Sequence, residues 1–413
     1  MNLQPGLSSR VRTLIDRGVT ISCPYSVQVD ETVDAGKIAP GVVIHSGCRI
    51  SGRTTSIGPG CELGAEAPVT LEDCQLGRKV SLKGGYFSGA TFLDGAVMGS
   101  SAHVRPATLM EEETGGAHAV GFKQTIFLSF VTAGSLINFC DALMAGGTSR
   151  KHHSEIGSSY IHFNYTPHQD KATPSLIGDV PRGVFLDRPP IFLGGQGGLV
   201  GPSRIAYGTV IPAGAICRRD ILEEGRIYDA SAGLKSERAF IPGAYRGIHR
   251  IVLNNLIYIG NLWALRAWYQ LVRSRTMSGD PFSAACHEGA LKRIEEGLQE
   301  RIKRMRELAG KMHDSLKHMR EGKTGELSPE IERQQQALAG GWPEIEEILI
   351  AGPPAAAGIE NRDVFMRAWK KVDTSSGHIK ALAALDPADR KAGAGWLQEI
   401  VNSAAVLWQK RYK

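Results

Sequence analysis

A six-residue period between Leu193 and Cys217 constrains the fold of this chain more than any other feature. Aliphatic residues recur at Leu193, Leu199, Ile205 and Ile211, and Cys217 follows in the same phase, with Gly, Ala, Pro or Ser crowded between them. This spacing differs from the helical period of about 3.6 residues and from the two-residue alternation of a single strand. Short fixed periods are typical of solenoids, and hexapeptides are typical of a β-helix whose aliphatic residues fill a narrow shaft.

The same rhythm occurs upstream and sets the expected domains. Aliphatic residues six apart form three further sets: Ile38, Ile44 and Ile50; Ile57, Leu63 and Val69; Leu76 and Leu82. The phase slips between the sets, so we expect loops or irregular corners there. We predict an N-terminal helix and lead-in over 1–25, a β-helix over 26–236 with an irregular active-site segment at 100–192, and an α-helical region over 237–413.

The expected helical region carries two strong patterns. Residues 246–277 are aromatic-rich and apolar on most sides, which predicts a helix buried against another element. Apolar residues from Leu291 to Met319 follow three- and four-residue steps, which predicts a long amphipathic helix. That stripe fits a core or helix-hairpin face, with an intermolecular coiled coil as the alternative.

Composition narrows the function classes. A net charge of +6 over 413 residues suits a small anionic ligand such as a phosphate or CoA, and lacks the concentrated basic face of a nucleic-acid-binding protein. Seven cysteines without a C-x-x-C pair indicate reduced thiols and a cytoplasmic protein. The N-terminus has no apolar signal-peptide core, and the apolar stretch 251–265 is too short to span a membrane, so we expect neither.

The irregular segment carries the residues that suggest chemistry. On A-x-x-R-P at 102–106, H-x-[ST]-x-[LI]-G at 152–157 and N-Y at 164–165, the chain resembles the acetyltransferase half of the bifunctional glucosamine-1-phosphate acetyltransferase/N-acetylglucosamine-1-phosphate uridylyltransferase family. The runs LIGD, GLVGP and IPAGAICRRD are similar to the closing coils of that family. The resemblance implies a left-handed parallel β-helix, a homotrimer with active sites between subunits, and acetyl-CoA as co-substrate.

The resemblance also implies roles for single residues. Arg105 would hold the sugar phosphate, His152 would be the catalytic histidine, Asn164 and Tyr165 would lie beside the acetyl group, and Lys171 would be the lysine of the following loop. The family's substrate-binding Tyr is replaced by Glu155, and the interval from His152 to Asn164 is shorter than in the family.

Two further observations bear on the resemblance. An alternative register over 133–142 places Ser135 where the family has its histidine and Asn138 where it has its tyrosine, which leaves no base. The Gly-rich phosphate loop that would open the nucleotidyltransferase half is missing, so we do not expect uridylyl transfer.

Acyl transfer to an amine has clear chemical requirements. A histidine near neutral pKa, His152 or its neighbour His153, can take the amine proton. Asn164 or a backbone amide can stabilise the oxyanion. Phosphate needs cations, for which Arg105, Lys123 and Lys171 are candidates. For CoA the candidates are the arginines and small residues of the closing coils, which let a ligand approach the backbone: Gly194, Gly195, Gly197, Gly198, Arg218 and Arg219.

The expected function is therefore acetyl-CoA-dependent acylation of an amino group on a phosphorylated or nucleotide-linked sugar. A non-catalytic β-helix scaffold is the alternative. A zinc enzyme is a third possibility, raised by the histidines at 152, 153, 162 and 168. These lack the H-x4-H spacing of zinc-binding β-helices, so no metal is expected.

Overall fold

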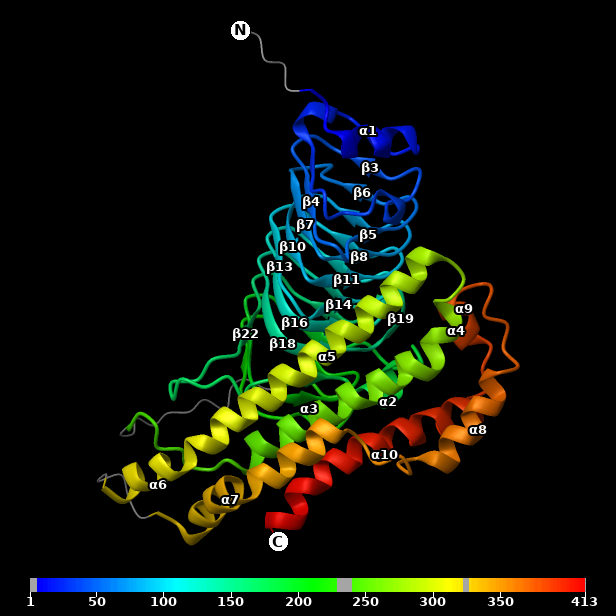
Figure 1. Ribbon diagram of the computed structural model, residues 1–413. Coiled ribbons are helices and arrows are strands. Elements are labelled where there is room, and N and C mark those ends of the chain that lie inside the picture. The colour runs from blue at the N-terminus through cyan, green and yellow to red at the C-terminus, as the bar shows by residue number, and fades with distance from the viewer. Residues whose placement is uncertain (1–5, 229–239, 322–326, 413) are drawn as a thin grey trace.

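Each turn of the chain between Thr20 and Cys217 adds short parallel strands to the faces of a left-handed β-helix, and an α-helical region follows it (Figure 1). The computed structural model describes residues 6–228, 240–321 and 327–412. The fold class expected from the six-residue period is confirmed.

The solenoid has three faces. Face 1 is a single parallel sheet made of β1 (Thr20–Ile21), β3 (Val43–Ile44), β6 (Glu62–Leu63), β9 (Ser81–Leu82), β12 (Val97–Met98), β15 (Gly115–Gly116), β17 (Thr132–Ala133), β21 (Glu155–Ile156), β24 (Phe192–Leu193) and β27 (Val210–Ile211). Face 2 contains β2 (Gln28–Val29), β4 (Arg49–Ser51), β7 (Val69–Glu72), β10 (Gly85–Ser88), β13 (Ala102–Val104), the first halves of β16 (Gly121–Phe127) and β18 (Asn138–Met144), β22 (Ile161–Phe163), β25 (Gly198–Val200) and β28 (Ile216–Cys217). Face 3 contains β5 (Ser56–Ile57), β8 (Gln75–Leu76), β11 (Ala90–Phe92), β14 (Thr108–Met110), the second halves of β16 and β18, β23 (Ser175–Ile177) and β26 (Arg204–Ile205).

The residues of the six-residue period line the shaft, as predicted. None of the set Leu193, Leu199, Ile205, Ile211 and Cys217 is more than 2% exposed. Val210, the strand neighbour of Ile211, is 39% exposed because adjacent residues of a strand point to opposite sides. Each buried aliphatic side chain stabilises the shaft by about 1.5–3 kcal/mol.

The N-terminal end of the solenoid is covered by α1 (Ser9–Asp16), which buries Val11 and Leu14 (Figure 1). Strand β1 already pairs with β3. Regular coils therefore begin before residue 26, where the sequence predicted them to begin. The predicted boundary between residues 236 and 237 lies outside the described residues.

The helical region contains α3 (His249–Trp268), a π-helical turn at Tyr269–Arg273, α4 (Ser274–Thr276), α5 (Pro281–Gly310), α6 (Met312–Glu321), α7 (Pro329–Ala351), α8 (Ile359–Trp369), α9 (His378–Ala383) and α10 (Pro387–Tyr412). Helix α3 packs against α5, α10 and β23, which explains why it is apolar on most sides. The stripe from Leu291 to Met319 forms two helices, because α5 ends at Gly310 and α6 begins at Met312. Its buried members include Leu298, Met305 and Leu308.

Helix α5 runs obliquely across face 3 (Figure 1), where it contacts β5, β8, β11 and β14. It starts at an Asp280 cap, whose carboxylate accepts hydrogen bonds from the backbone of Phe282 and Ser283. The same carboxylate pairs with Arg78 of the solenoid at 2.6 Å. The helical layer therefore packs on face 3. No helix within the described ranges is both long and apolar enough to cross a membrane.

Candidate active site on the second face of the solenoid

Face 2 presents a straight column of outward side chains. The strand register places Lys123 beside Cys140 and Phe163 beside Val200. The pairing of Asn138 with Ile161 places Cys140 one layer from Phe163. Arg105 and Arg218 directly follow their strands and continue the same register at the two ends. In chain order the column is Arg105, Lys123, Cys140, Phe163, Val200 and Arg218. At about 4.8 Å per layer it spans about 24 Å.

One end of the column is an uncompensated basic site. The guanidinium of Arg105 lies 3.5 Å from Cys140 Sγ, and Lys123 occupies the layer between these two residues. Neither cation has a carboxylate within ion-pair distance among the described residues. Burial raises the pKa of the Cys140 thiol, so the thiol stays protonated and adds no negative charge. Two adjacent half-buried cations without counter-charges favour an anionic group such as a phosphate.

Asn164 lies at the edge of the same face. Its amide nitrogen donates to Asp141 Oδ2 at 2.7 Å, and Asp141 directly follows Cys140. Asp141 turns the corner from face 2 to face 3 with a left-handed φ of +59°. The structure thus brings three predicted residues, Arg105, Lys123 and Asn164, to neighbouring layers.

The other two residues predicted to bind substrate flank this group. Tyr165 is 57% exposed beside Asn164. Lys171 lies in the loop that follows them, and its backbone carbonyl accepts a hydrogen bond from Arg301 at 3.1 Å.

His152 and His153 lie at a different corner, where the chain passes from face 3 to face 1. They form β20 (His152–His153), which pairs antiparallel with β19 (Gly147–Ser149) in a small hairpin. His153 Nδ1 bonds to the Arg150 carbonyl oxygen at 2.8 Å, and its Nε2 lies 3.8 Å from Glu155. Within one chain the structure does not bring these histidines to Asn164. Their role as base stays a prediction, and it requires the hairpin of a second copy.

His103 is a candidate that the sequence reasoning missed. It points outward from β13 two residues before Arg105, with its ring 5.1 Å from the ring of Tyr86. Its neighbour in the next layer is Gly121, which has no side chain to cover it. The signal was present in the sequence, because alternate residues of the A-x-x-R-P strand share a face.

His162 is a packing residue. It is buried and bonds to the Cys140 carbonyl oxygen at 2.5 Å and to Ser175 Oγ at 2.8 Å. Burial lowers its pKa, which keeps the ring neutral.

Comparison with known proteins finds relatives of part of the chain. No family model matches the chain. The bifunctional protein GlmU of Pelobacter propionicus is 29% identical over 211 residues, which are 51% of this chain and 41% of that protein. GlmU of Thermotoga petrophila is 25% identical over 213 residues, or 51% of this chain and 42% of the relative. GlmU of Thermus thermophilus is 33% identical over 156 residues, or 34% of this chain and 33% of the relative.

The chain is related to the acetyltransferase half of GlmU. It spans about two fifths of the length of the first two of these relatives.

The glycines of the closing coils, expected from the GlmU resemblance to line a CoA groove, have a role in coil stacking. A Cβ at Gly194 would lie 2.3 Å from the Ala213 nitrogen, and one at Gly198 would lie 2.4 Å from Phe163 Cε2. A Cβ at Gly195 would lie 2.9 Å from the Ser158 carbonyl oxygen, and one at Gly197 would lie 2.7 Å from the Ala215 carbonyl oxygen. Contact of these glycines with CoA stays a prediction. Arg218 and Arg219 are both exposed, and the guanidinium of Arg219 lies 5.3 Å from the Tyr228 ring centroid.

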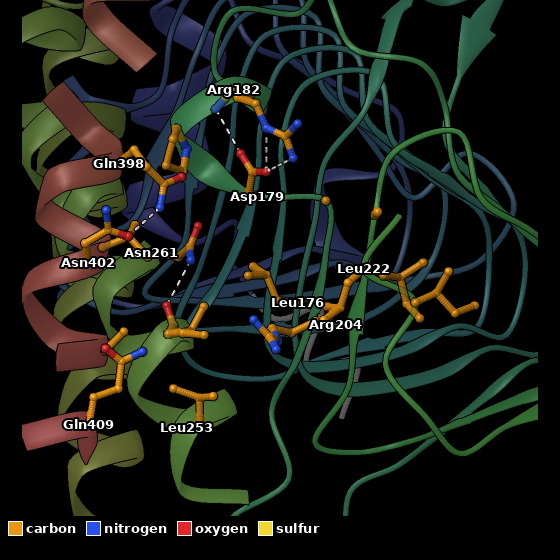
Figure 2. A pocket seen from close by; sticks show the side chains of 18 residues that line it. Leu176, Asp179, Arg182, Arg204, Leu222, Leu253, Asn261, Gln398, Asn402 and Gln409 are labelled. Atoms are coloured by element: carbon orange, nitrogen blue, oxygen red, sulfur yellow. Dashed lines mark hydrogen bonds and ion pairs between the residues drawn. The ribbon is translucent and has the colours of Figure 1, made fainter. Parts of the chain in front are cut away.

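A separate cavity of about 360 Å³ lies between the end of the GlmU-like solenoid and helices α3 and α10 (Figure 2). Its charged side chains are compensated, because Arg182 pairs with Asp179, and Arg204 lies 3.5 Å from Asp220. The cavity is therefore close to neutral. This separates it chemically from the basic site at Arg105 and Lys123. Among the described residues no three His, Cys, Asp or Glu side chains are placed to hold a metal ion.

Proposed function

We propose that this protein is an acetyl-CoA-dependent acyltransferase that acts on an amino group of a phosphorylated or nucleotide-linked sugar. The observation that carries the proposal is the uncompensated pair Arg105 and Lys123 beside Asn164. The relation to GlmU supports the choice of acetyl transfer. The seven cysteines of the chain are all free, which supports a cytoplasmic location.

The column on face 2 suggests how two substrates lie. Arg105 and Lys123 bind the acceptor's phosphate, with Lys171 and Tyr165 at the edge of the site. The pantetheine arm of acetyl-CoA lies along the coils between about 190 and 220, where it contacts Val200, and Phe163 contacts it from the adjoining layer. Arg218, with Arg219 beside it, binds CoA phosphates at the other end.

The chemical step follows from these positions. The acceptor nitrogen attacks the thioester carbonyl carbon, a histidine takes the amine proton, and the C–S bond breaks to release CoA, whose thiolate takes a proton. Asn164 donates to the oxyanion with its second N–H, because the first is bound to Asp141. The base is His152 or His153, delivered by the hairpin of a neighbouring copy in a homotrimer.

Ligand binding and product formation test the proposal together. Acetyl-CoA and CoA should each raise the melting temperature in proportion to RT ln(1 + [L]/Kd). Incubation with acetyl-CoA and a panel of amino-sugar phosphates, glucosamine 1-phosphate included, should yield an N-acetylated product by mass spectrometry. If millimolar acyl-CoA produces neither a thermal shift nor calorimetric heat, the enzyme proposal fails.

A non-catalytic scaffold is the second candidate. One observation favours it: the column of six outward side chains contains no histidine. A scaffold predicts no acyl-CoA binding at the column, so the same titrations separate the two functions.

A further inference from the structure

We propose that the helical region completes the active site, with Arg301 of α5 acting as a positioning residue for Asn164. The proposal rests on the function proposed above, and it assigns a role to a region for which the sequence suggested none. Arg301 acts through Asp141 and through the loop of residues 164–173, which we call the 164–173 loop.

The central contact is a buried ion pair between the helix and the solenoid. Arg301 Nη2 lies 2.7 Å from Asp141 Oδ1, and both side chains are only 2% exposed. The second carboxylate oxygen, Asp141 Oδ2, accepts the hydrogen bond from the Asn164 amide at 2.7 Å. One carboxylate therefore connects a helix side chain to a residue of the proposed site.

The other arm of the same guanidinium holds the loop. Arg301 Nη1 donates to the Lys171 carbonyl oxygen at 3.1 Å. The planar fork of an arginine can direct two donors at two fixed acceptors, which a lysine ammonium does less well. Arg301 thus fixes the loop and its first residue, Asn164, at the same time.

Further hydrogen bonds join the helical region to the 164–173 loop. Asn255 of α3 donates to the Ala172 carbonyl oxygen at 3.0 Å. The Tyr245 hydroxyl donates to Asp170 Oδ2 at 2.8 Å. Lys311, between α5 and α6, donates to the Gln169 carbonyl oxygen at 2.8 Å. Supporting hydrogen bonds from several elements suit a loop that must hold one geometry for a ligand.

The physical effect on Asn164 is orientation. An amide side chain can present either its oxygen or its nitrogen to a ligand, and the two differ little in shape. The buried carboxylate of Asp141 accepts only, so it directs the Asn164 nitrogen toward itself. That arrangement leaves one N–H and the amide oxygen for the ligand.

Two substitutions on the same helix test the inference. Arg301→Lys keeps the charge that Asp141 needs but loses the fork. Arg293→Lys is the matched control, since Arg293 is equally buried on α5 and pairs within the helix with Glu296. Limited trypsin digestion, followed by mass spectrometry of the peptide ending at Lys171, reports on the loop without any ligand. Titration and steady-state assay with acetyl-CoA report on the site.

We expect Arg301→Lys to speed cleavage after Lys171 about tenfold and to weaken acetyl-CoA affinity or kcat/KM by a similar factor, while Arg293→Lys changes neither. Unchanged cleavage in Arg301→Lys would show that Arg301 does not hold the 164–173 loop, and would overturn the proposal. Faster cleavage with unchanged acetyl-CoA affinity and kcat/KM would overturn the positioning role. If wild-type protein binds no acetyl-CoA, the proposed function fails. The cleavage result alone then decides whether Arg301 holds the 164–173 loop.

Discussion

The Tyr269 hydroxyl donates a hydrogen bond to Glu111 Oε1 at 2.7 Å, and so joins the π-helical turn after α3 to the solenoid. Glu111 also accepts from the Ser129 backbone amide at 3.2 Å. Arg273, which is fully buried, pairs with the neighbouring Glu112. Burial raises the pKa of Glu111 to about 7, against the opposing effect of Arg273.

Glu111 should therefore make stability depend on pH. Because its pKa is raised in the folded state, its stabilising contribution is complete below the ordinary carboxyl pKa of 4.5 and is lost as pH rises through about 7. Glu111→Gln should reduce the fall in unfolding free energy between pH 5 and pH 8, by on the order of 1–3 kcal/mol. Urea unfolding at the two pH values measures this, with the exposed Glu360→Gln as control. An unchanged pH dependence in Glu111→Gln would contradict the prediction.

Strand β27 offers a matched pair for the shaft. Ile211→Ala should lower the free energy of unfolding by about 2–5 kcal/mol, because it removes buried methyl groups and leaves a cavity. Val210→Ala, one residue earlier and pointing outward, should cost less than about 1 kcal/mol. Denaturant titration of both variants gives the comparison. Equal losses of unfolding free energy would mean that the two side chains do not lie on opposite sides of the sheet that contains β27.

The identity of the base can be decided by histidine replacements. Alanine at the residue that takes the amine proton should lower kcat by about 100-fold or more. We expect this for His152 or His153 if a neighbouring copy supplies the base, and for His103 if the base lies in the same chain. Steady-state assays of the three single variants make the distinction.

Subunit mixing provides the control. If the base comes from a neighbour, mixing the inactive histidine variant with an Arg105→Met variant, whose acceptor binding is weakened, should restore activity at low acceptor concentration, since some sites then combine two intact halves. Full activity in all three histidine variants would exclude these residues as bases.

Arg105 should act mainly through acceptor binding. Arg105→Met removes a charge-assisted contact to phosphate, so we expect the acceptor KM to rise about 10- to 100-fold, with a smaller change in kcat. Arg49→Met is the control, because Arg49 is exposed on face 2 nearer the N-terminus. A fall in kcat with constant KM would instead place Arg105 at the transition state.

The six-residue period predicted the shaft well, because every aliphatic residue in that phase has to point inward once the chain coils. Because successive coils stack as adjacent layers, the proximity of Arg105, Lys123 and Asn164 could also be predicted. The hairpin with His152 and His153 was not predictable in this way. Gly146 and Gly147 both take left-handed φ values, +103° and +106°, and the chain leaves the regular coil there.

Arg301 could not be found from its sequence pattern. Its helix showed only an apolar stripe, and the ion pair with Asp141 joins residues 160 positions apart. Periodicity in the sequence describes local structure. The docking of α5 on face 3 depends instead on the shape complementarity between the helix surface and the folded solenoid.

The oblique path of α5 has a consequence for cooperativity. In a solenoid each coil touches only its neighbours, so such arrays can fray from an end. A 30-residue helix is about 45 Å long, and α5 contacts strands from β5 to β14 before Arg301 reaches β18. Opening any one of these coils disturbs packing on a helix that the others share. Amide hydrogen exchange should therefore show the coils beneath α5 opening together with a single free energy, while the coils nearer α1 open independently.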